Sequence, residues 1–263
     1  MKHSNKEIKR NDNATRIFDD RSVASDYRTL VPILRPGLRV LDIGCGTGAI
    51  SAGIAGYVGA NGYVVGIDRT EKFIQRGRHS YGAVPNLELV HVDLFDYEPA
   101  EMFDLIVSAR TLQWLSNPKE ALEKMKDLLL PNGQVSILDY NHTALEWRPD
   151  PPTSMRKLYQ AFLQWRADAG MNNKISEDLV GYFSALGFHS IEVLDADEVY
   201  VRGQDNFISK LRIWSKVAEL TQIVDEGYLE EEHRLTAIQE YNQWVDTVAA
   251  LMIMKLKEVR ASI

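Results

Sequence analysis

The sequence predicts an α/β protein built on a doubly wound, mainly parallel sheet. Short apolar runs, each suited to a buried strand, alternate with segments of helical periodicity between residues 39 and about 200. The first apolar run leads directly into three glycines at alternate positions, Gly44, Gly46 and Gly48. Because strands and helices alternate throughout this stretch, we expect helices on both faces of one sheet.

Length and composition are those of one globular domain with additions. The chain has 263 residues, of which 45% are hydrophobic and 25% are charged. We expect a single domain over residues 1–263. Residues 139–172 and 204–249 interrupt the alternating pattern and are interpreted as helical insertions within that domain.

Charge and cysteine content narrow the functional classes. The net charge is −7, from 30 basic and 37 acidic residues, which argues against a nucleic-acid partner because such a partner requires a broad basic face. The single cysteine, Cys45, cannot form an internal disulfide, and a cytoplasmic location is expected. No run of 18 apolar residues exists, so no membrane span is expected. Residues 1–10 lack a signal-peptide core, and no metal-ligand spacing is apparent.

The residues before the first strand predict one helix. Residues 1–20 are polar and are expected to be mobile, at least where they begin. Ser22 can cap the helix, because its hydroxyl can accept a hydrogen bond from a first-turn amide. Pro32 is expected to kink its end, and Pro36-Gly37 to turn the chain into the first strand. The apolar stripe of this helix consists of Val23, Tyr27, Leu30, Val31 and Leu34.

The chain is organised around residues 39–50. Residues 40–43 suit a buried strand, and a helix is expected over residues 49–57. Glycines between the two allow the backbone to approach a ligand, and the first amides of the helix bring partial positive charge into the same space. The spacing Gly44-x-Gly46-x-x-Ala49 nominally matches a dinucleotide fingerprint. The glycine spacing alone therefore does not distinguish a nicotinamide cofactor from other nucleoside cofactors.

Acidic residues follow the next two predicted strands. Residues 63–67 predict a strand that ends at Asp68, where a carboxylate about 20 residues beyond the glycines can accept the hydroxyls of a ribose. A helix is expected over residues 71–81 and a third strand over residues 87–91. Asp93 comes just after that strand, so both carboxylates are expected at the same edge of the sheet.

The remaining elements are predicted less regularly. A fourth strand is expected at 103–108 and continues toward Leu115, a helix capped by Asn117 follows, and the fifth strand spans 134–138. Further helices are expected over 154–168 and after Ser176, the latter ended by Gly187. A sixth strand is expected over 191–201, and a final strand over 251–259 with Met254 and Leu256 on one face. Two helical stripes lie between these strands, separated by Gly227. The first consists of Phe207, Leu211, Trp214, Val217 and Leu220, and the second of Leu235, Ile238, Val245 and Val248.

The glycine loop resembles a known family. Residues 41–48, Leu-Asp-Ile-Gly-Cys-Gly-Thr-Gly, are similar at every position to the first motif of class I S-adenosylmethionine (SAM) methyltransferases. Their acidic residue, Asp42, favours this family over a dinucleotide-binding protein, because a carboxylate suits the ammonium group of SAM and repels a pyrophosphate. The resemblance covers residues 39 to about 200 and is closest to the ubiquinone/menaquinone-type and trans-aconitate-type enzymes. It implies a Rossmann-like sheet of seven strands whose last strand, 251–259, is antiparallel.

The resemblance also implies the cofactor site. The loop amides and Asp42 hold the amino-acid end of SAM, Asp93 and the amide of Leu94 meet the adenine, and the backbone at 108–110 receives the ammonium group. The N-terminal helix closes over the cofactor, although Tyr27 is equally suited to the core, and Cys45 is a small packed residue rather than a nucleophile. The candidates for cofactor binding are Tyr27, Arg28, Asp42, Gly44, Cys45, Gly46, Gly48, Asp68, Arg69, Asp93, Leu94, Ser108, Ala109 and Arg110.

The predicted function is methyl transfer from SAM to an O, N or C atom of a small molecule. Two alternatives stay open: a non-catalytic SAM-binding module with a blocked acceptor cavity, and an NAD-dependent dehydrogenase. His142 is the candidate general base by position, with Tyr140 and Glu146 as rivals and an ordinary loop residue as the alternative. The acceptor and the oligomeric state cannot be read from the sequence.

Residues 139–172, together with the N-terminal helix, are expected to cover the acceptor pocket. The segment follows the fifth strand, on the ligand-binding edge of the sheet, and it is rich in aromatic residues that could form apolar walls. Arg148, Arg156 and Arg166 could hold a carboxylate, which favours an aromatic or acidic acceptor. In the alternative interpretation, the aromatics only pack the helix onto the domain and the arginines are solvated.

Overall fold

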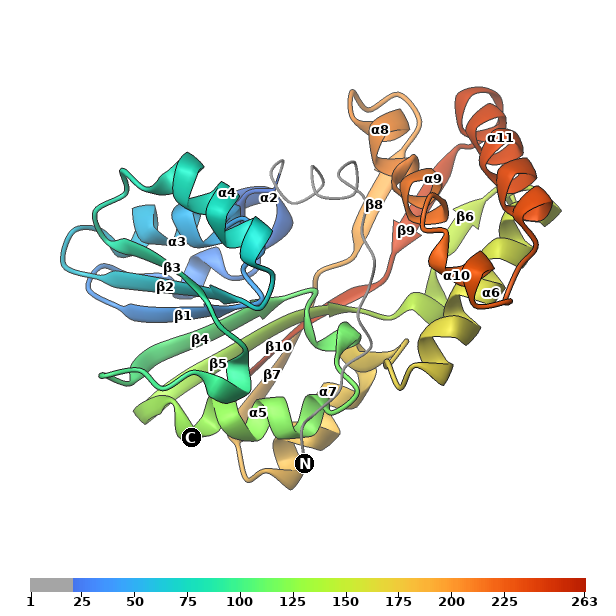
Figure 1. Ribbon diagram of the computed structural model, residues 1–263. Helices are drawn as coiled ribbons and strands as arrows, with labels where there is room; N and C mark the ends of the chain where they lie inside the picture. Colours follow the sequence, from blue (N-terminus) through green and yellow to red (C-terminus); the bar gives the residue numbers. More distant parts are fainter. Residues whose placement is uncertain (1–20) are drawn as a thin grey trace.

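The computed structural model describes residues 21–263, and the expectation for residues 1–20 lies outside this range. A seven-stranded sheet forms the centre of the molecule, in the order β3-β2-β1-β4-β5-β10-β7 (Figure 1). Strands β1 to β5 are parallel, whereas β10 runs antiparallel to both β5 and β7. The predicted fold with its antiparallel final strand is therefore confirmed. The strands are β1 (Arg39–Ile43), β2 (Tyr63–Asp68), β3 (Leu87–His91), β4 (Phe103–Ala109), β5 (Leu129–Tyr140), β7 (His189–Asp195) and β10 (Leu256–Ser262).

Helices cover both faces of this sheet. On one face, α2 (Val23–Asp26), α3 (Ala49–Val58) and α4 (Glu71–Tyr81) lie over the parallel strands, and α5 (Pro118–Asp127) and α7 (Ile175–Ala185) cover the other face (Figure 1). Two apolar clusters fill the spaces between sheet and helices, one on each face. The central strands are consequently buried on both sides, which explains why they appear in the sequence as continuous apolar runs.

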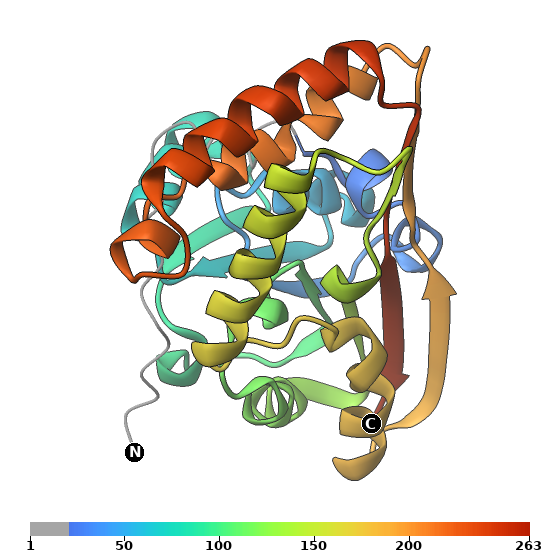
Figure 2. The same cartoon turned by 90° about the vertical axis from the view of Figure 1, so that its right-hand side faces the viewer.

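A second layer, which we call the cap, consists of residues 146–168 and 198–254. It contains a three-stranded antiparallel sheet in the order β6-β9-β8 and five helices, and it stands beside the end of the main sheet where β4 and β5 terminate (Figures 1 and 2). Its elements are β6 (Glu146–Arg148), α6 (Thr153–Asp168), β8 (Glu198–Val201), α8 (Phe207–Leu211), α9 (Ile213–Ala218), α10 (Gln222–Asp225), α11 (Glu231–Thr247) and β9 (Leu251–Met254).

An aromatic cluster forms the core of the cap. Trp214 is central: its ring lies 4.9 Å from that of Tyr159 and 6.2 Å from those of Trp147 and Phe162. Tyr241 of α11 completes the cluster, 6.4 Å from Trp147. These contacts are mostly edge-to-face, an arrangement that adds favourable electrostatics to the burial of apolar area.

Two predicted long strands are each divided between the two sheets. The expected strand 191–201 is wrong as a single element, because β7 belongs to the main sheet and β8 to the cap sheet. Residues 251–259 are extended, as predicted, but they divide at Lys255 into β9 and β10. Asp197 fixes both crossings, since its carboxylate accepts from the Leu256 amide at 3.0 Å and from Lys255 Nζ at 2.7 Å. Met254 and Leu256 are both buried.

Two helix predictions and one strand prediction also need correction. The single N-terminal helix is wrong: Ser22 does cap α2, but α2 ends at Asp26, and Pro32 lies in a separate 3-10 turn because its ring nitrogen cannot donate to a continuing helix. Ser176 is not a cap, since α7 already begins at Ile175. Residues 110–115 do not continue β4, because Arg110 adopts a left-handed φ of 59° and a 3-10 turn follows at Leu112–Trp114.

The two stripes predicted in residues 204–249 become four helices. The first stripe is largely correct, because Phe207, Leu211 and Trp214 are buried. The second is wrong in part, since Leu235 and Val248 are about half exposed. The aromatic cluster instead draws Ala237, Tyr241 and Trp244 inward on α11. Within the described residues, no helix is both long and apolar enough to cross a membrane.

The aromatic cluster predicts a test of the cap. Trp214→Ala should lower the free energy of unfolding by about 3–5 kcal/mol, because it leaves a large cavity among packed rings. Leu235→Ala, on the exposed side of the same layer, should stay within about 0.5 kcal/mol of the parent protein. Urea denaturation followed by circular dichroism measures both changes. Equal effects of the two substitutions would show that the cap is not packed around Trp214.

Candidate functional site

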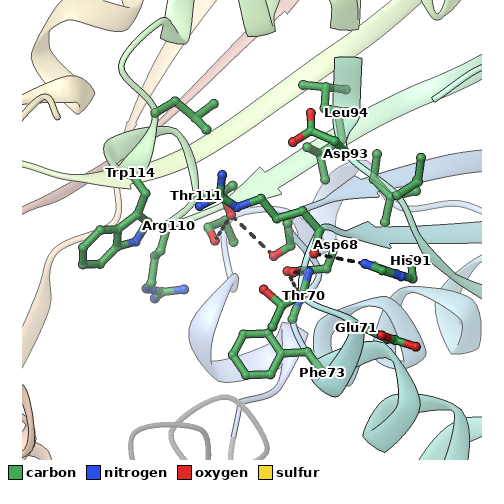
Figure 3. A pocket seen from close by; sticks show the side chains of 18 of the residues that line it. Asp68, Thr70, Glu71, Phe73, His91, Asp93, Leu94, Arg110, Thr111 and Trp114 are labelled. Atoms are coloured by element: carbon green, nitrogen blue, oxygen red, sulfur yellow. Dashed lines mark hydrogen bonds between the residues drawn. The ribbon is translucent and has the colours of Figure 1, made fainter. Parts of the chain in front are cut away.

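A cavity of about 640 Å³ opens at the carboxyl ends of β1 to β4 (Figure 3). Its volume lies within the range of about 300–1,000 Å³ that small-molecule sites occupy. Asp68 and Asp93 lie on one side of it, whereas Arg110 and Trp114 lie together on the other (Figure 3). The described lining residues are Arg21, Ile43, Gly44, Gly46, Ile67, Asp68, Arg69, Thr70, Glu71, Phe73, His91, Val92, Asp93, Leu94, Phe95, Ala109, Arg110, Thr111, Trp114 and Leu115.

The glycine loop forms the floor of the cavity. Gly44, Gly46 and Gly48 have φ values of 71°, 59° and 80°, a conformation that side chains rarely adopt. A Cβ on Gly44 would also overlap the side chain of Thr111. Both the backbone conformation and the available space therefore require glycine at this position. Helix α3 begins directly after Gly48 and turns its first amides toward this edge of the sheet. Gly44 and Gly46 line the cavity, while Gly48 packs against Leu89 instead.

Asp68 ties this loop to the end of β2. One carboxylate oxygen accepts from the Gly46 amide at 3.0 Å and the other from the Thr70 amide at 2.8 Å. A carboxylate has about four acceptor positions, so each oxygen keeps one for a ligand. Asp68 therefore holds the loop and presents acceptors to the cavity at once, which is the geometry that recognition of a diol requires.

The end of β3 supplies the next wall. Asp93 caps a short 3-10 turn, Leu94–Asp96, by accepting from the Phe95 amide at 3.0 Å. Asp93, Leu94 and Arg69 all line the cavity, as the sequence predicts. The Arg69 carbonyl meets His91 Nε2 at 3.1 Å, which joins the ends of β2 and β3.

Asp42 lies beneath the glycine loop. It is buried, and Ser51 donates to it at 2.6 Å. Burial raises the pKa of its carboxyl to about 6, because the charged form loses water. Asp42 borders a small recess of about 20 Å³ together with Cys45, Ala109 and Arg21. Burial also raises the pKa of the Cys45 thiol, which is contrary to a nucleophilic role.

Besides Gly48, three predicted cofactor ligands lie away from the cavity. Tyr27 is fully buried and donates to the Ser136 carbonyl at 2.9 Å, so its alternative role in the core is the one observed. Arg28 is exposed and reaches only the Asp197 carbonyl, at 3.4 Å. The Ser108 hydroxyl is buried and donates to the Ile43 carbonyl at 2.9 Å, which links β4 to β1. The short α2 leaves Arg21, rather than these side chains, at the cavity.

His142 is also away from the cavity, which corrects its assignment as a general base. It is buried, with Nε2 at 2.6 Å from Gln113 Oε1 and its ring against Tyr140, Phe162 and Trp214. Burial holds its pKa well below the usual range, so it stays neutral. Among its rivals, Tyr140 accepts from Arg110, with a pKa that burial raises to about 12. Glu146 pairs with Arg148 at the surface.

The insertion 139–172 provides none of the described lining residues. Its aromatic side chains form the core of the cap, so the packing alternative is observed and the proposed aromatic wall is not. The three arginines are scattered: Arg148 pairs with Glu146 at 2.8 Å and Arg156 with Asp150 at 3.5 Å, both at the surface. Arg166 is fully buried and donates to the Gln113 carbonyl at 3.0 Å.

Several lining residues were not predicted from the sequence. Arg21 precedes the Ser22 cap, and no local pattern marks it as a ligand. Trp114 has the character of a packing residue in the sequence, yet it lines the cavity together with Thr111 and Leu115. Its position in the Leu-Gln-Trp segment after β4 was the available signal. Among the described residues, no group of three or more His, Cys, Asp or Glu side chains could hold a metal ion.

Comparison with known proteins identifies the family. The pattern described as "Methyltransferase domain" matches residues 34–208. A tRNA U34 carboxymethyltransferase of Alteromonas mediterranea is 28% identical over 172 residues, covering 61% of this chain and 48% of that protein. A demethylmenaquinone methyltransferase of Staphylococcus aureus is 27% identical over 179 residues, covering 61% and 71%. The chain spans about half the length of the first curated relatives it matches.

Solved structures share the fold. A SAM-dependent methyltransferase from Aquifex aeolicus superposes with a TM-score of 0.56 at 17% identity, covering 97% of this chain and 100% of that one. The chain thus has a Rossmann-like fold, and it belongs to the methyltransferase domain family. The predicted class I methyltransferase family is confirmed. This membership decides against an NAD-dependent dehydrogenase.

The requirement for glycine at position 44 gives a direct test. Gly44→Ala should weaken SAM binding at least 10-fold and lower the free energy of unfolding by about 1–2 kcal/mol, because the new Cβ meets Thr111 and the backbone is left-handed. Gly56→Ala is the matched control, since its Cβ would enter open space on α3. It should leave SAM binding unchanged and add roughly 0.5–1 kcal/mol of stability. Calorimetry and thermal denaturation measure both, and equal SAM affinities would contradict the loop geometry.

The raised pKa of Asp42 predicts a pH dependence. Below its ordinary pKa of 3.8 the carboxyl is protonated in both folded and unfolded states, and between 3.8 and about 6 only the unfolded state ionises. The stability of the parent protein relative to Asp42→Asn should therefore fall by up to about 1.4 kcal/mol per pH unit across this window and be constant above it. Denaturation of both proteins from pH 4 to 8 measures the difference. A difference that rises with pH would show that the carboxylate is stabilised when charged.

Proposed function

We propose that the protein transfers a methyl group from SAM to an O, N or C atom of a small-molecule acceptor. The observation that carries the proposal is the cavity at the carboxyl edge of the sheet, with acidic residues at one end and Trp114 at the other. The cavity continues beyond the glycine loop to Trp114 and Leu115, whereas a non-catalytic module would have its acceptor space blocked.

The residues present suit SAM. Asp68 would accept the ribose hydroxyls with its remaining lone pairs, and Asp93 with the Leu94 amide would face the adenine. Asp42 lies under the loop at the recess, where its buried charge would attract the ammonium group, and Arg21 borders the same recess as a partner for the carboxylate.

Methyl transfer requires little chemistry from the chain itself. SAM supplies a methyl group activated by its sulfonium centre, which an acceptor atom displaces in line. The cavity walls would align the acceptor and exclude water, which are the main contributions that a protein can make to such a displacement. Among the described lining residues His91 is the only imidazole, and its Nε2 is engaged with the Arg69 carbonyl. We therefore assign no general base.

A small acceptor agrees better with the chain than a tRNA. The name of one relative specifies tRNA and that of another demethylmenaquinone. The net charge of −7 is unfavourable for a polyanion, because tRNA binding depends on displaced counterions at a basic surface. Apolar lining residues, namely Phe73, Phe95, Trp114 and Leu115, support a compact acceptor with apolar surface. We place this activity in the cytoplasm.

The role of Asp68 tests the cofactor assignment. Asp68→Ala should weaken SAM binding about 10- to 150-fold, because it removes charge-assisted hydrogen bonds worth roughly 1.5–3 kcal/mol. Asp150→Ala makes the same chemical change at an exposed position of the surface and should leave SAM affinity unchanged. Titration calorimetry on both folded variants, with NAD as a second ligand that should not bind, measures the outcome. An unchanged affinity in Asp68→Ala would reject the proposed ribose contact.

A further inference from the structure

At the rim of the cavity after β4, a buried arginine lies against the ring of a tryptophan. Trp114 lines the cavity, and the guanidinium carbon of Arg166 lies 4.3 Å from the centre of its ring. Arg166 is fully buried on α6, where water does not screen its charge, and the buried carboxylate of Asp139 interacts with it electrostatically. The cap thus contributes a cation directly behind a residue of the cavity wall, although it provides none of the described lining residues.

Arg166 is fixed in this position by several hydrogen bonds. Its Nη2 donates to the Gln113 carbonyl at 3.0 Å and to Gln113 Oε1 at 3.2 Å, and its Nε donates to Asn173 Oδ1 at 2.7 Å. The Gln113 amide in turn donates to Asp139 at 3.1 Å. Gln113 is the neighbour of Trp114 in the same 3-10 turn, so Arg166 determines the position of both the backbone and the ring.

A cation on one face of an aromatic ring changes what the rest of the ring prefers to bind. The guanidinium draws π-electron density toward itself, so the ring becomes a poorer partner for a second cation and a better one for an electron-rich ring. Arg110 is a further fixed cation on the same side of the cavity as Trp114 (Figure 3). Its Nε donates to the Tyr140 hydroxyl at 2.9 Å, and its Nη2 forms an ion pair with Glu198 at 2.5 Å. The carboxylates of Asp68, Glu71 and Asp93 belong to the opposite, cofactor-binding side.

We infer that Trp114 is the specificity-determining wall of the acceptor site, that Arg166 is its positioning residue, and that the acceptor is a planar, electron-rich or anionic aromatic molecule. The inference rests on the proposed function and adds the class of acceptor to it. We expect cationic amines to bind poorly at this end of the cavity, because Arg166 already lies against the Trp114 ring. The acceptor stacks on or against Trp114 while the cofactor occupies the glycine-loop end.

Three matched aromatic ligands test this inference in place of the unidentified acceptor. The protein is saturated with S-adenosylhomocysteine and titrated with 2-naphthoate, 2-naphthol and 2-naphthylmethylammonium, which share one ring system and differ in charge. We expect 2-naphthoate to bind most tightly and the ammonium compound at least 10-fold more weakly. Equal affinities, or tighter binding of the ammonium compound, would overturn the inference with the unmodified protein alone.

Variants then assign the effect to residues. Trp114→Leu should weaken binding of 2-naphthoate about 10-fold while SAM affinity stays within about 3-fold, because stacking contributes at this scale and the cofactor contacts lie elsewhere. Arg166→Met should remove the preference for 2-naphthoate over the ammonium compound, and Arg166→Lys should restore part of it. Arg156→Met is the matched control on the same helix, since Arg156 is exposed and pairs with Asp150.

The outcomes separate this inference from the proposed function. If SAM and S-adenosylhomocysteine fail to bind the parent protein, the proposed function is wrong. Titration of the cofactor-free protein with the three naphthalene ligands still tests the charge preference of the site beside Trp114. If SAM binds but Arg166→Met retains the full charge preference, Arg166 has only a structural role and the inference is overturned. Should Arg166→Met not fold, the Trp114→Leu variant and the ligand series on the parent protein remain decisive.

Discussion

The site depends on one constraint, the attachment of the glycine loop to the end of β2. The amides of Gly44 and Cys45 both donate to the Ile67 carbonyl, at 2.9 and 3.1 Å, and the Gly46 amide donates to Asp68 at 3.0 Å. Three successive donors are thus directed at one strand end, which is possible only because glycines accept the left-handed backbone that this geometry requires. The loop is consequently held open beside the first turn of α3, where a ligand can reach it.

This constraint also explains why the cavity has two chemically different ends. The attachment brings the acidic residues that follow β2 and β3 to one side, whereas the turn after β4 places Arg110 and Trp114 on the other. A cofactor with a ribose and an adenine suits the first side, because carboxylates accept hydroxyl and amino protons. The second side is left for an acceptor, and the cap reaches it only indirectly, through Arg166 and the Gln113–Trp114 turn.

The parts that could be predicted from the sequence are those with local causes. Strands and helices between residues 39 and 108 follow from apolar periodicity and glycine spacing, and the structure agrees closely with them there. The positions of Asp68 and Asp93 at the cavity follow from acidic residues at strand ends. The cap depends on distant pairing instead. Whether 191–201 is one strand or two is decided by Asp197, whose carboxylate fixes Lys255 and Leu256, 58 and 59 residues further along the chain.

Several predicted site residues were wrong for the same reason, because their side chains contact residues that are distant in the sequence. Tyr27 appeared suited to the cofactor, but its hydroxyl finds Ser136, 109 positions along the chain. His142 and Arg166 appeared to be a base and an anion ligand, yet both are buried around Gln113, 29 and 53 residues earlier in the chain. Polar side chains in an insertion can satisfy one another as readily as they can bind a ligand, and only the tertiary contacts distinguish the two.

The most direct measurement is a crystal structure of the protein with S-adenosylhomocysteine. We expect ribose hydroxyls within hydrogen-bond distance of Asp68, adenine beside Asp93 and Leu94, and the cofactor sulfur facing open space that Trp114 borders. A cofactor that fills the space beside Trp114, or whose ribose lies away from Asp68, would contradict this expectation.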